Sequence, residues 1–461
     1  MKTTLVLTDI VSNPIRRVCR EPLETAGVLL ATLAQTGGEA RLLGRKLMMV
    51  GEDSYLARHG DGLSIASEGY VPSLAEAERL GAIPIWFHTH PGPDGWPLPS
   101  LADRKVDEQI GELFRLRANA PFYGTLIASP RGDEIIFSGA LQAEDGTTFN
   151  IDRLWQVGER WRLTHAVNAA EPELSPIFDR NVRAFGRAIQ NTIGALRVAI
   201  VGCGGTGSAV AEQLVRLGVR RLLLIDADKL SASNVTRVYG STPKGEGTFK
   251  TELLRAHLCT IAPDLDCQVM PSMITLENTA RKLVDRDLIF GCTDDNAGRL
   301  VLSRLSSYFL TPVIDVGVLL SSDATGSLTG IDGRVTVLSP GAACLVCRDR
   351  VDLARAAVEL RTPDERRRLE DEGYAPALAG VEPAVVAFTT AVAAAAVNEL
   401  LERLVGYGPL PRPNEVLLRL HEREISTNRT LPRPGHYCDV ANGKLGVGQT
   451  TPFLEQTWPN P

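Results

Sequence analysis

The segment Val198-Ala-Ile-Val-Gly202-Cys-Gly204-Gly-Thr-Gly207 decides the fold class of the C-terminal part of the chain. Its apolar, largely β-branched start predicts a buried strand, and glycines at G-x-G-x-x-G spacing predict a tight turn that opens a helix. At such a turn, backbone amides and the positive end of the helix can approach a phosphate group closely. The segment therefore predicts a Rossmann-like α/β unit that binds a nucleotide.

Strands and helices alternate around this segment, which implies a parallel sheet with crossover helices. We expect strands at residues 196–202, 221–226, 287–291 and 416–421, and helices at residues 178–189, 210–217, 251–259 and 383–404. Residues 177–440 are predicted to form one domain. The Gly-, Pro- and Thr-rich residues 441–461 are predicted to form a mobile tail.

The first third of the chain predicts a second α/β domain, residues 1–165. Apolar runs and helical periodicity carry this prediction. We expect strands at residues 28–34, 41–50, 83–90, 122–129 and 134–141, and helices at residues 73–80, 100–117 and 151–163. The pattern then decays into residues 166–176, which we interpret as a linker.

Composition argues against several classes of protein. The 461 residues are 44% hydrophobic and 23% charged, as in a globular chain that buries a core. A net charge of −6 argues against the broad basic surface of a nucleic-acid-binding protein. The longest uncharged run is shorter than the roughly 20 residues of a membrane span, and eight scattered cysteines do not indicate a disulfide framework. We expect a cytoplasmic protein whose partners are neither nucleic acid nor membrane.

The segment Trp86-Phe-His88-Thr-His90-Pro places two imidazoles at positions i and i+2 near a strand end, so both can face one side. Asp103 follows in the first turn of the next predicted helix. Two histidines and a carboxylate commonly hold a catalytic zinc ion and leave one position for a water molecule. The alternative is structural, because Ser100 and Asp103 also fit a helix capping box.

These residues resemble the motif of the JAB/MPN (JAMM) zinc metalloprotease family, His-x-His-Pro followed by Ser-x-x-Asp. The family also carries a glutamate before an apolar strand, and Glu24-Thr-Ala-Gly27 matches it. The resemblance covers roughly residues 1–165 and implies a mixed sheet with flanking helices. It also implies cleavage of peptide or isopeptide bonds at the C-terminus of ubiquitin-like proteins. The implied roles are zinc ligand for His88, His90 and Asp103, general base for Glu24, and oxyanion partner for Ser100.

Charged residues after the glycine turn argue against a dehydrogenase. Asp226 and Asp228 follow the next predicted strand, where a carboxylate can bind a ribose hydroxyl. Arg237 and Lys250 suit a triphosphate better than a hydride acceptor, and Asp294 offers Mg²⁺ an oxygen ligand at a strand end. The alternative makes Arg237 and Lys250 solvated surface charges and Asp294 a helix cap.

Together these residues resemble the ubiquitin-activating-type adenylating family, which includes the ThiF- and MoeB-like adenylyltransferases of sulphur carriers. The shared pattern runs from the glycine turn through Ser-Asn-x-x-Arg to Cys-Thr-Asp, over about residues 176–440. The resemblance implies adenylation of the C-terminal glycine of a ubiquitin-like protein by ATP and Mg²⁺, and a homodimer. The residues implied in ATP binding are Gly202, Gly204, Gly205, Thr206, Gly207, Asp226, Asp228, Asn234, Arg237, Lys250 and Asp294. Those implied in catalysis are Arg237, Lys250 and Asp294, with Asp294 as the Mg²⁺ ligand.

Two short-spaced pairs, Cys344-x-x-Cys347 and His436-x-Cys438, suggest a structural zinc site, and the alternative is a set of buried thiols. Relatives that pass their substrate to a cysteine usually keep that thiol between the Cys-x-x-Cys loop and the long helix. Residues 348–383 contain none. We therefore expect direct transfer of the adenylated modifier to a partner's nucleophile, for example that of a conjugating-enzyme-like protein.

The sequence thus predicts two opposed activities on a ubiquitin-like modifier, cleavage at its C-terminus and adenylation of its terminal glycine. One alternative is a sulphur-carrier pathway, in which the adenylate is converted to a thiocarboxylate. Another is a non-catalytic scaffold that binds such modifiers. Loss of the zinc ligands or of Arg237 and Lys250 would favour the scaffold, and all of these residues are present.

Overall fold

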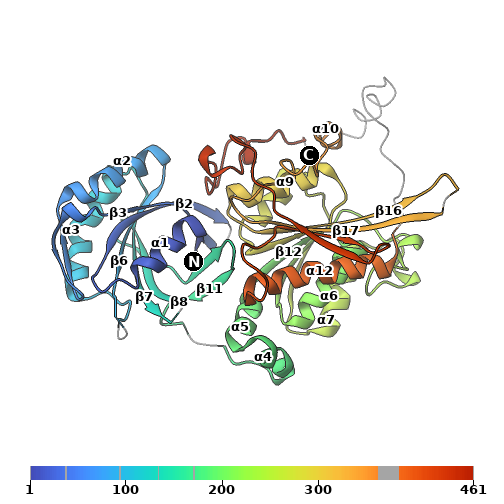
Figure 1. Ribbon diagram of the computed structural model, residues 1–461, viewed down its shortest axis with the longest axis horizontal. Coiled ribbons are helices and arrows are strands. Elements are labelled where there is room, and N and C mark those ends of the chain that lie inside the picture. Colours follow the sequence, from blue (N-terminus) through green and yellow to red (C-terminus); the bar gives the residue numbers. More distant parts are fainter. Residues whose placement is uncertain are drawn as a thin grey trace. The chain divides into compact units, whose positions relative to one another are not determined.

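The computed structural model describes residues 2–36, 39–92, 95–132, 134–169, 172–325, 327–361 and 384–459. They form two compact units (Figure 1). The N-terminal unit contains Met1–Glu171 with Gly446–Gly448, and the C-terminal unit contains Pro172–Leu445 with Gln449–Pro461. The boundary at 171/172 lies within the stretch that the sequence indicates as a linker.

The N-terminal unit is built on a mixed sheet in the order β11-β10-β1-β3-β2-β6-β7-β8-β9. The pairs β1–β10, β1–β3 and β6–β7 are parallel, and the other pairs are antiparallel. The strands are β1 (Lys2–Thr8), β2 (Ala26–Thr36), β3 (Glu39–Met49), β6 (Ile83–Thr89), β7 (Phe122–Arg131), β8 (Glu134–Ala143), β9 (Thr148–Asn150), β10 (Arg153–Val157) and β11 (Arg162–His165). A separate hairpin consists of β4 (Tyr55–Arg58) and β5 (Leu63–Ile65).

Each face of this sheet has its own apolar core. The helices of the unit are α1 (Asp9–Val18), α2 (Val71–Leu80) and α3 (Leu101–Arg117). Leu29 and Phe87 pack with α1 in one core, and Val28 and Trp86 pack with α2 and α3 in the other. Successive residues of a strand point to opposite faces. His88, two residues after Trp86, is therefore directed to the face that α3 covers.

The helix predicted at residues 151–163 is wrong, because this segment forms β10 and β11. β10 pairs in parallel with β1, and the fully buried Trp155 lies opposite Val6. Trp161 packs edge-on against Trp155, with ring centroids 6.3 Å apart. The apolar spacing of the segment fits a helix as well as a strand, so the distant partner β1 decides its conformation. β1 and α1 are not among the elements predicted from the sequence.

The C-terminal unit is built on a sheet in the order β14-β13-β12-β15-β16-β17-β18-β19. Neighbouring strands are parallel from β14 to β16 and antiparallel from β16 to β19. The chain order reverses between β12 and β15, and open α/β sheets bind ligands at such a switch point. The strands are β12 (Arg197–Val201), β13 (Arg221–Ile225), β14 (Asp266–Met270), β15 (Leu288–Gly291), β16 (Val313–Ser322), β17 (Leu328–Leu338), β18 (Glu415–Arg419) and β19 (Glu424–Asn428).

Helices cover both faces of this sheet. They are α4 (Asp179–Phe185), α5 (Arg187–Ala195), α6 (Gly205–Leu217), α7 (Lys250–Ile261), α8 (Glu277–Ala280), α9 (Asn296–Tyr308), α10 (Leu353–Glu359) and α12 (Val386–Val405). Figure 1 shows α6, α7 and α12 on one face, and α9 and α10 on the other. The helix predicted at residues 178–189 is two helices, because Gly186 between them has a φ of +88°. Within the described ranges, no helix has the length and apolar composition needed to cross a membrane.

The C-terminal segment packs on α9 and does not form the mobile tail predicted over residues 441–461. Phe453 is buried, and its ring centroid lies 5.8 Å from that of Phe309. The hydroxyl of Tyr308 donates a hydrogen bond of 2.7 Å to the carboxylate of Glu455. The prediction is wrong because a few anchoring side chains hold a segment whose average composition is that of a loop.

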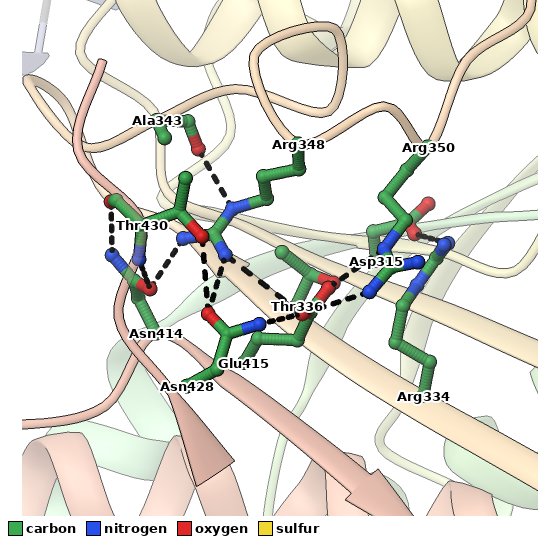
Figure 2. Close-up of polar contacts among 10 residues, drawn as sticks. All are labelled: Asp315, Arg334, Thr336, Ala343, Arg348, Arg350, Asn414, Glu415, Asn428 and Thr430. Atoms are coloured by element: carbon green, nitrogen blue, oxygen red, sulfur yellow. Dashed lines mark hydrogen bonds and ion pairs between the residues drawn. The ribbon is translucent and has the colours of Figure 1, made fainter.

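A buried polar cluster joins β17 and β18 to the loop before α10 (Figure 2). Glu415 is 1% exposed and accepts two hydrogen bonds of 3.1 Å from Arg350. Thr336 and Asn428 also donate to this carboxylate, and Arg348 lies 4.0 Å from it. Burial disfavours the ionised carboxylate, but the two arginines outweigh this effect and lower the pKa of Glu415.

Glu415→Ala should lower the free energy of unfolding of the C-terminal unit by about 3–5 kcal/mol, because it leaves Arg348 and Arg350 without a buried counter-charge. Urea unfolding followed by circular dichroism measures the change. The control is Glu424→Ala on β19, which removes a half-exposed carboxylate paired with Arg419 and should cost less than about 1 kcal/mol. Equal, small losses of unfolding free energy in both variants would contradict the role of Glu415 as the buried counter-charge of the two arginines.

Candidate nucleotide and metal sites

The glycine turn between β12 and α6 leaves no room for side chains at two positions. Gly202 follows β12 with a φ of +91°, and a Cβ on Gly207 would lie 1.8 Å from the carbonyl oxygen of Gly202. A Cβ on Gly204 would meet no atom within 4 Å. Gly205 and Thr206 begin α6, and the first backbone N–H groups of a helix have no partner within it. The turn therefore presents amides that can face an anion.

Asp226 ties this turn to the end of β13. One carboxylate oxygen accepts a hydrogen bond of 2.6 Å from the amide of Cys203, and the other accepts one of 2.8 Å from the amide of Asp228. Burial raises the pKa of Asp226, although the charge of Lys250 and the two amides act in the opposite direction. Each oxygen keeps a second lone pair that a ribose hydroxyl could use.

Lys250 begins α7 and turns its ammonium toward the same end of the sheet. Its Nζ lies 2.7 Å from a carboxylate oxygen of Asp228, and its amide donates to the Asp228 carbonyl oxygen at 3.0 Å. Lys250 is buried, whereas Asp228 is exposed. A buried ammonium that holds an exposed carboxylate can exchange this partner for phosphate oxygens.

The chain before Tyr239 brings Arg237 over the start of α6. Carbons of the Arg237 side chain lie 3.4 Å from the position that a Cβ on Gly205 would take. The backbone carbonyl oxygen of the buried Asn234 accepts a hydrogen bond from the amide of Arg237. The amide of Tyr239 donates a hydrogen bond of 3.0 Å to Oγ of Ser208. These contacts fix Arg237 within reach of the glycine turn.

Asp294 lies just beyond β15 and is exposed. The neighbouring Asp295 is the residue that caps α9, and it accepts hydrogen bonds from Thr293 and Gly298. The alternative that Asp294 caps the helix is therefore wrong. In the part of the chain that the structure describes, Asp294 makes no hydrogen bond or ion pair, so its carboxylate is available to a cation.

Thiols near this end of the sheet are poor nucleophiles. Burial and the carboxylate of Asp226 raise the pKa of Cys203, and burial together with Asp315 raises that of Cys292. Burial also raises the pKa of Cys267, which lies at the start of β14 and away from this end, to about 12. A thiol in such surroundings rarely forms the reactive thiolate. Much of the cysteine-free stretch noted in the sequence, residues 362–383, lies outside the described residues.

In the N-terminal unit, His88, His90 and Asp103 converge. Nε2 of His88 lies 3.2 Å from Nε2 of His90 and 3.2 Å from Oδ1 of Asp103, and Nε2 of His90 lies 3.5 Å from Oδ2 of Asp103. Ligand atoms about 2 Å from a tetrahedral zinc ion are separated by roughly 3.3 Å. The donor set therefore fits a zinc ion with one open position.

Neighbouring groups orient His90 and Asp103. Nδ1 of His90 lies 2.8 Å from the carbonyl oxygen of Trp96. Ser100 Oγ accepts the Asp103 amide at 3.1 Å, and Asp103 Oδ2 accepts the Ser100 amide at 2.7 Å. The capping box and the converging ligand set thus coexist. Burial opposes ionisation of Asp103, but hydrogen bonds from His88, His90 and Ser100 lower its pKa.

Glu24 lies beside this cluster, two residues before β2. Its Oε1 is 3.9 Å from Nε2 of His90, and the residue is 6% exposed. Burial raises the pKa of Glu24, while the charges of His88 and His90 partly offset this effect. A carboxylate with a raised pKa at this distance suits the transfer of a proton from a water molecule.

Arg58 in β4 positions Glu24, a role that the sequence did not predict. Its Nε donates to the Glu24 carbonyl oxygen at 2.8 Å, and an Nη donates to Oγ1 of Thr25 at 2.5 Å. The guanidinium group also lies 4.7 Å from the ring centroid of Tyr55 and 2.8 Å from a carboxylate oxygen of Glu52. No motif marks Arg58, because only the folded hairpin brings it to this strand.

Comparison with known proteins decides the family of the C-terminal unit. The ThiF family model matches residues 178–440, more than half of the chain. The chain belongs to the ThiF family. The matched ThiF domain contains the glycine turn and all of the residues expected to bind ATP.

Curated relatives of the ThiF domain include ubiquitin-like modifier-activating enzyme 5 from Bombyx mori, 28% identical over 192 residues. That alignment covers 39% of this chain and 45% of the relative. The Caenorhabditis elegans protein of the same name is 32% identical over 162 residues, 32% of this chain and 36% of the relative. The chain thus spans less than half the length of these relatives. A crystal structure of E. coli MccB with MccA-N7isoASN aligns at 17% identity and a TM-score of 0.46, over 59% of this chain and 76% of that chain.

Near the end of the ThiF domain, the sequence-predicted ligands Cys344, Cys347, His436 and Cys438 come together. Sγ of Cys344 lies 3.5 Å from Nδ1 of His436, and Sγ of Cys347 lies 3.6 Å from Sγ of Cys438. Nδ1 of His436 is 3.3 Å from Sγ of Cys438, and all four ligand atoms lie within 4.8 Å of one another. Three sulfurs and one nitrogen in this arrangement fit a structural zinc ion.

Gly207→Ala should destabilise the ThiF domain by about 3 kcal/mol or more, since the new methyl group forces the backbone of the glycine turn apart. The matched control is Gly204→Ala, whose methyl group meets no neighbour; because alanine caps a helix less well than glycine, it should still cost up to about 1 kcal/mol. Thermal unfolding of the two variants and the unmodified protein measures the difference. Equal unfolding temperatures for the two variants would show that the turn is looser than described.

Proposed function

We propose that the ThiF domain uses ATP and Mg²⁺ to adenylate the C-terminal glycine of a ubiquitin-like protein. The observation that carries this proposal is the convergence of the glycine turn, Asp226, Lys250, Arg237 and Asp294 at the carboxyl ends of β12, β13 and β15. The family match supports ATP chemistry. The curated relatives, which are named as activating enzymes of ubiquitin-like modifiers, support the class of substrate.

The residues divide the work of holding ATP. Asp226 accepts a ribose hydroxyl, and amides of the glycine turn face the phosphates. Lys250 exchanges Asp228 for phosphate oxygens, while Arg237 approaches them from above the start of α6. Asp294 would hold Mg²⁺, which would supply neutralisation of the phosphate charge.

The reaction joins the modifier to the nucleotide at the α-phosphorus. An oxygen of the terminal carboxylate forms the new bond, and the bond from the α-phosphorus to the bridging oxygen breaks, so pyrophosphate leaves with that electron pair. Negative charge that develops on pyrophosphate is stabilised by Lys250 and Arg237. Both cations are held in place before the reaction, so little reorganisation is needed.

Asp294→Asn should lower modifier-dependent ATP–pyrophosphate exchange by at least about 100-fold, because the neutral amide binds Mg²⁺ poorly. The matched control is the adjacent Asp295→Asn. Asparagine caps a helix as well as aspartate does, so this variant should keep its exchange rate within about threefold. If Asp294→Asn exchanges as fast as the unmodified protein, Asp294 is not the metal ligand.

We further propose that the N-terminal unit is a zinc peptidase that cleaves after the terminal glycine of such a modifier. The convergence of His88, His90 and Asp103, with the buried Glu24 beside them, favours this second function. Zinc held there would polarise a water molecule and lower its pKa toward 7. Glu24 takes the proton of this water and passes it to the leaving amine. The Ser100 oxygen accepts an amide hydrogen bond, so its own proton remains available to stabilise the oxyanion.

Glu24→Gln should reduce cleavage of a modifier–peptide fusion by about 100-fold or more, since a neutral amide cannot accept the proton. Elemental analysis should still find two zinc ions per chain, because Glu24 is not among the proposed ligands. Glu21→Gln, an exposed neighbour, serves as the control and should cleave normally. Cys438→Ser, which removes a ligand of the second proposed zinc site, should retain only the zinc ion at His88, His90 and Asp103. Normal cleavage by Glu24→Gln would exclude Glu24 as the base.

The two proposed activities fit one pathway of protein modification. The peptidase would expose the terminal glycine of a precursor or release modifiers from their targets, and the ThiF domain would activate that glycine. Raised thiol pKa values at Cys203 and Cys292 favour direct transfer to a conjugating-enzyme-like partner. We also propose a homodimer and a structural zinc ion at Cys344, Cys347, His436 and Cys438.

The sulphur-carrier alternative shares the adenylation step and differs in the second nucleophile, because sulfur would then attack the adenylate. Mass spectrometry of the modifier after reaction distinguishes a thiocarboxylate from a conjugate. The scaffold alternative requires neither exchange nor cleavage, so it is separated from both enzymes by the two assays above.

A further inference from the structure

Two arginines on the α9 face of the ThiF sheet have no role in the chemistry proposed above. Arg299 of α9 and Arg334 of β17 flank Asp315 of β16, which is fully buried. Nη2 of Arg334 lies 2.6 Å from Oδ2 of Asp315, and Nε of Arg299 lies 3.5 Å from Oδ1. Figure 2 shows Arg334 and Asp315 beside the cluster around Glu415.

Most hydrogen-bond donors of this pair are unused. Among the described residues, Arg334 makes one side-chain hydrogen bond, to Asp315, and Arg299 makes only the 3.5 Å ion pair. Nε of each arginine is buried without a hydrogen-bond partner, and each side chain is only 16% exposed. One carboxylate faces two guanidinium groups, so the group carries an excess positive charge that is mostly shielded from water.

Both guanidinium groups face the same small space above Gly317. Nη2 of Arg334 and Nη2 of Arg299 lie 3.4 and 3.5 Å from the position that a Cβ on Gly317 would take. Gly317 has no side chain that would stand between the two groups, and it is partly exposed.

This space lies beside the proposed nucleotide site. Asp315 is the parallel partner of Gly291 at the end of β15, and Asp294 follows Gly291 by three residues. Gly317, two residues past Asp315, is therefore one strand away from the chain that leads to Asp294. Neighbouring strands are about 4.8 Å apart.

We propose that Arg299 and Arg334 form the subsite that receives the C-terminal carboxylate of the modifier. This inference rests on the proposed adenylation. A guanidinium group donates charge-assisted hydrogen bonds to a carboxylate oxygen, and one carboxylate matches the excess charge of the pair. Asp315 fixes both groups in advance. The phosphates have separate partners on the other side of Asp294, at the glycine turn and Lys250.

The subsite gives the arginines a defined part in the reaction. They hold one carboxylate oxygen and leave the other directed at the α-phosphorus, where a reacting pair must come within about 3–3.5 Å. When the new bond forms and pyrophosphate leaves, the carboxylate loses its charge. The pair therefore binds the free acid more tightly than the acyl adenylate, which favours release of the product to the next nucleophile.

The test compares two fluorescent synthetic peptides that end in Gly-Gly, one with a free carboxylate and one with a C-terminal amide. Anisotropy measures their binding to the full chain with Mg²⁺ and a non-hydrolysable ATP analogue. The unmodified protein should prefer the carboxylate about tenfold, the strength of a charge-assisted hydrogen bond. Arg299→Gln should remove this preference, and Arg299→Lys should restore part of it. The affinity for the ATP analogue should change less than about twofold in both variants.

Matched variants separate recognition from folding. Arg419→Gln, on the exposed side of β18, removes the same charge and should keep the tenfold preference. Arg334→Gln alone would leave the buried Asp315 with only the longer ion pair to Arg299 as compensation for its charge. The double variant Asp315→Asn/Arg334→Gln therefore removes both charges. Once circular dichroism shows that it is folded, it should also lose the preference.

Equal affinity of the unmodified protein for the two peptides, or no binding of either, overturns the subsite. An unchanged preference in Arg299→Gln also overturns it. If Arg299→Gln instead weakens the ATP analogue at least tenfold, the arginines bind phosphate and the proposal is wrong. ATP–pyrophosphate exchange by the unmodified protein tests adenylation separately, so the two proposals can fail independently.

Discussion

The close approach of Gly207 to the carbonyl oxygen of Gly202 is the constraint on which the proposed nucleotide site depends. Because neither residue has a side chain, α6 begins directly against the end of β12. The carboxylate of Asp226 can then reach the turn, and the Arg237 side chain can lie over Gly205. A wider turn would separate these groups, so a steric condition at two glycines determines the electrostatics of the whole site.

Much of both candidate sites could be predicted from the sequence, because their residues stand at fixed places in regular elements. His88 and His90 share a face since strand side chains alternate, and Asp103 lies in the first turn of the helix that Ser100 caps. The glycine turn, likewise, needs only a strand before it and a helix after it. In these places the local pattern and the packed structure agree, as the consistency of natural sequences leads one to expect.

Features decided by distant partners could not be predicted in this way. The strand at Trp155 depends on pairing with β1, and Arg58 reaches Glu24 only after a hairpin folds. The convergence of Arg299 and Arg334 has the same origin. These residues of α9 and β17 meet at Asp315 of β16, and none of the three belongs to a motif recognised in the sequence. Periodicity describes what one segment can bury, but it does not identify which other segment covers it.

The C-terminal segment that packs on α9 has a consequence for how the domain is defined. Similarity to the ThiF family ends at residue 440, whereas the buried Phe453 and the bond from Tyr308 to Glu455 lie beyond it. The helix that these contacts stabilise begins next to Asp294. The part of the chain that folds is therefore longer than the part that is homologous, and a fragment cut at the family boundary would expose an apolar surface on the helix that follows the proposed magnesium ligand.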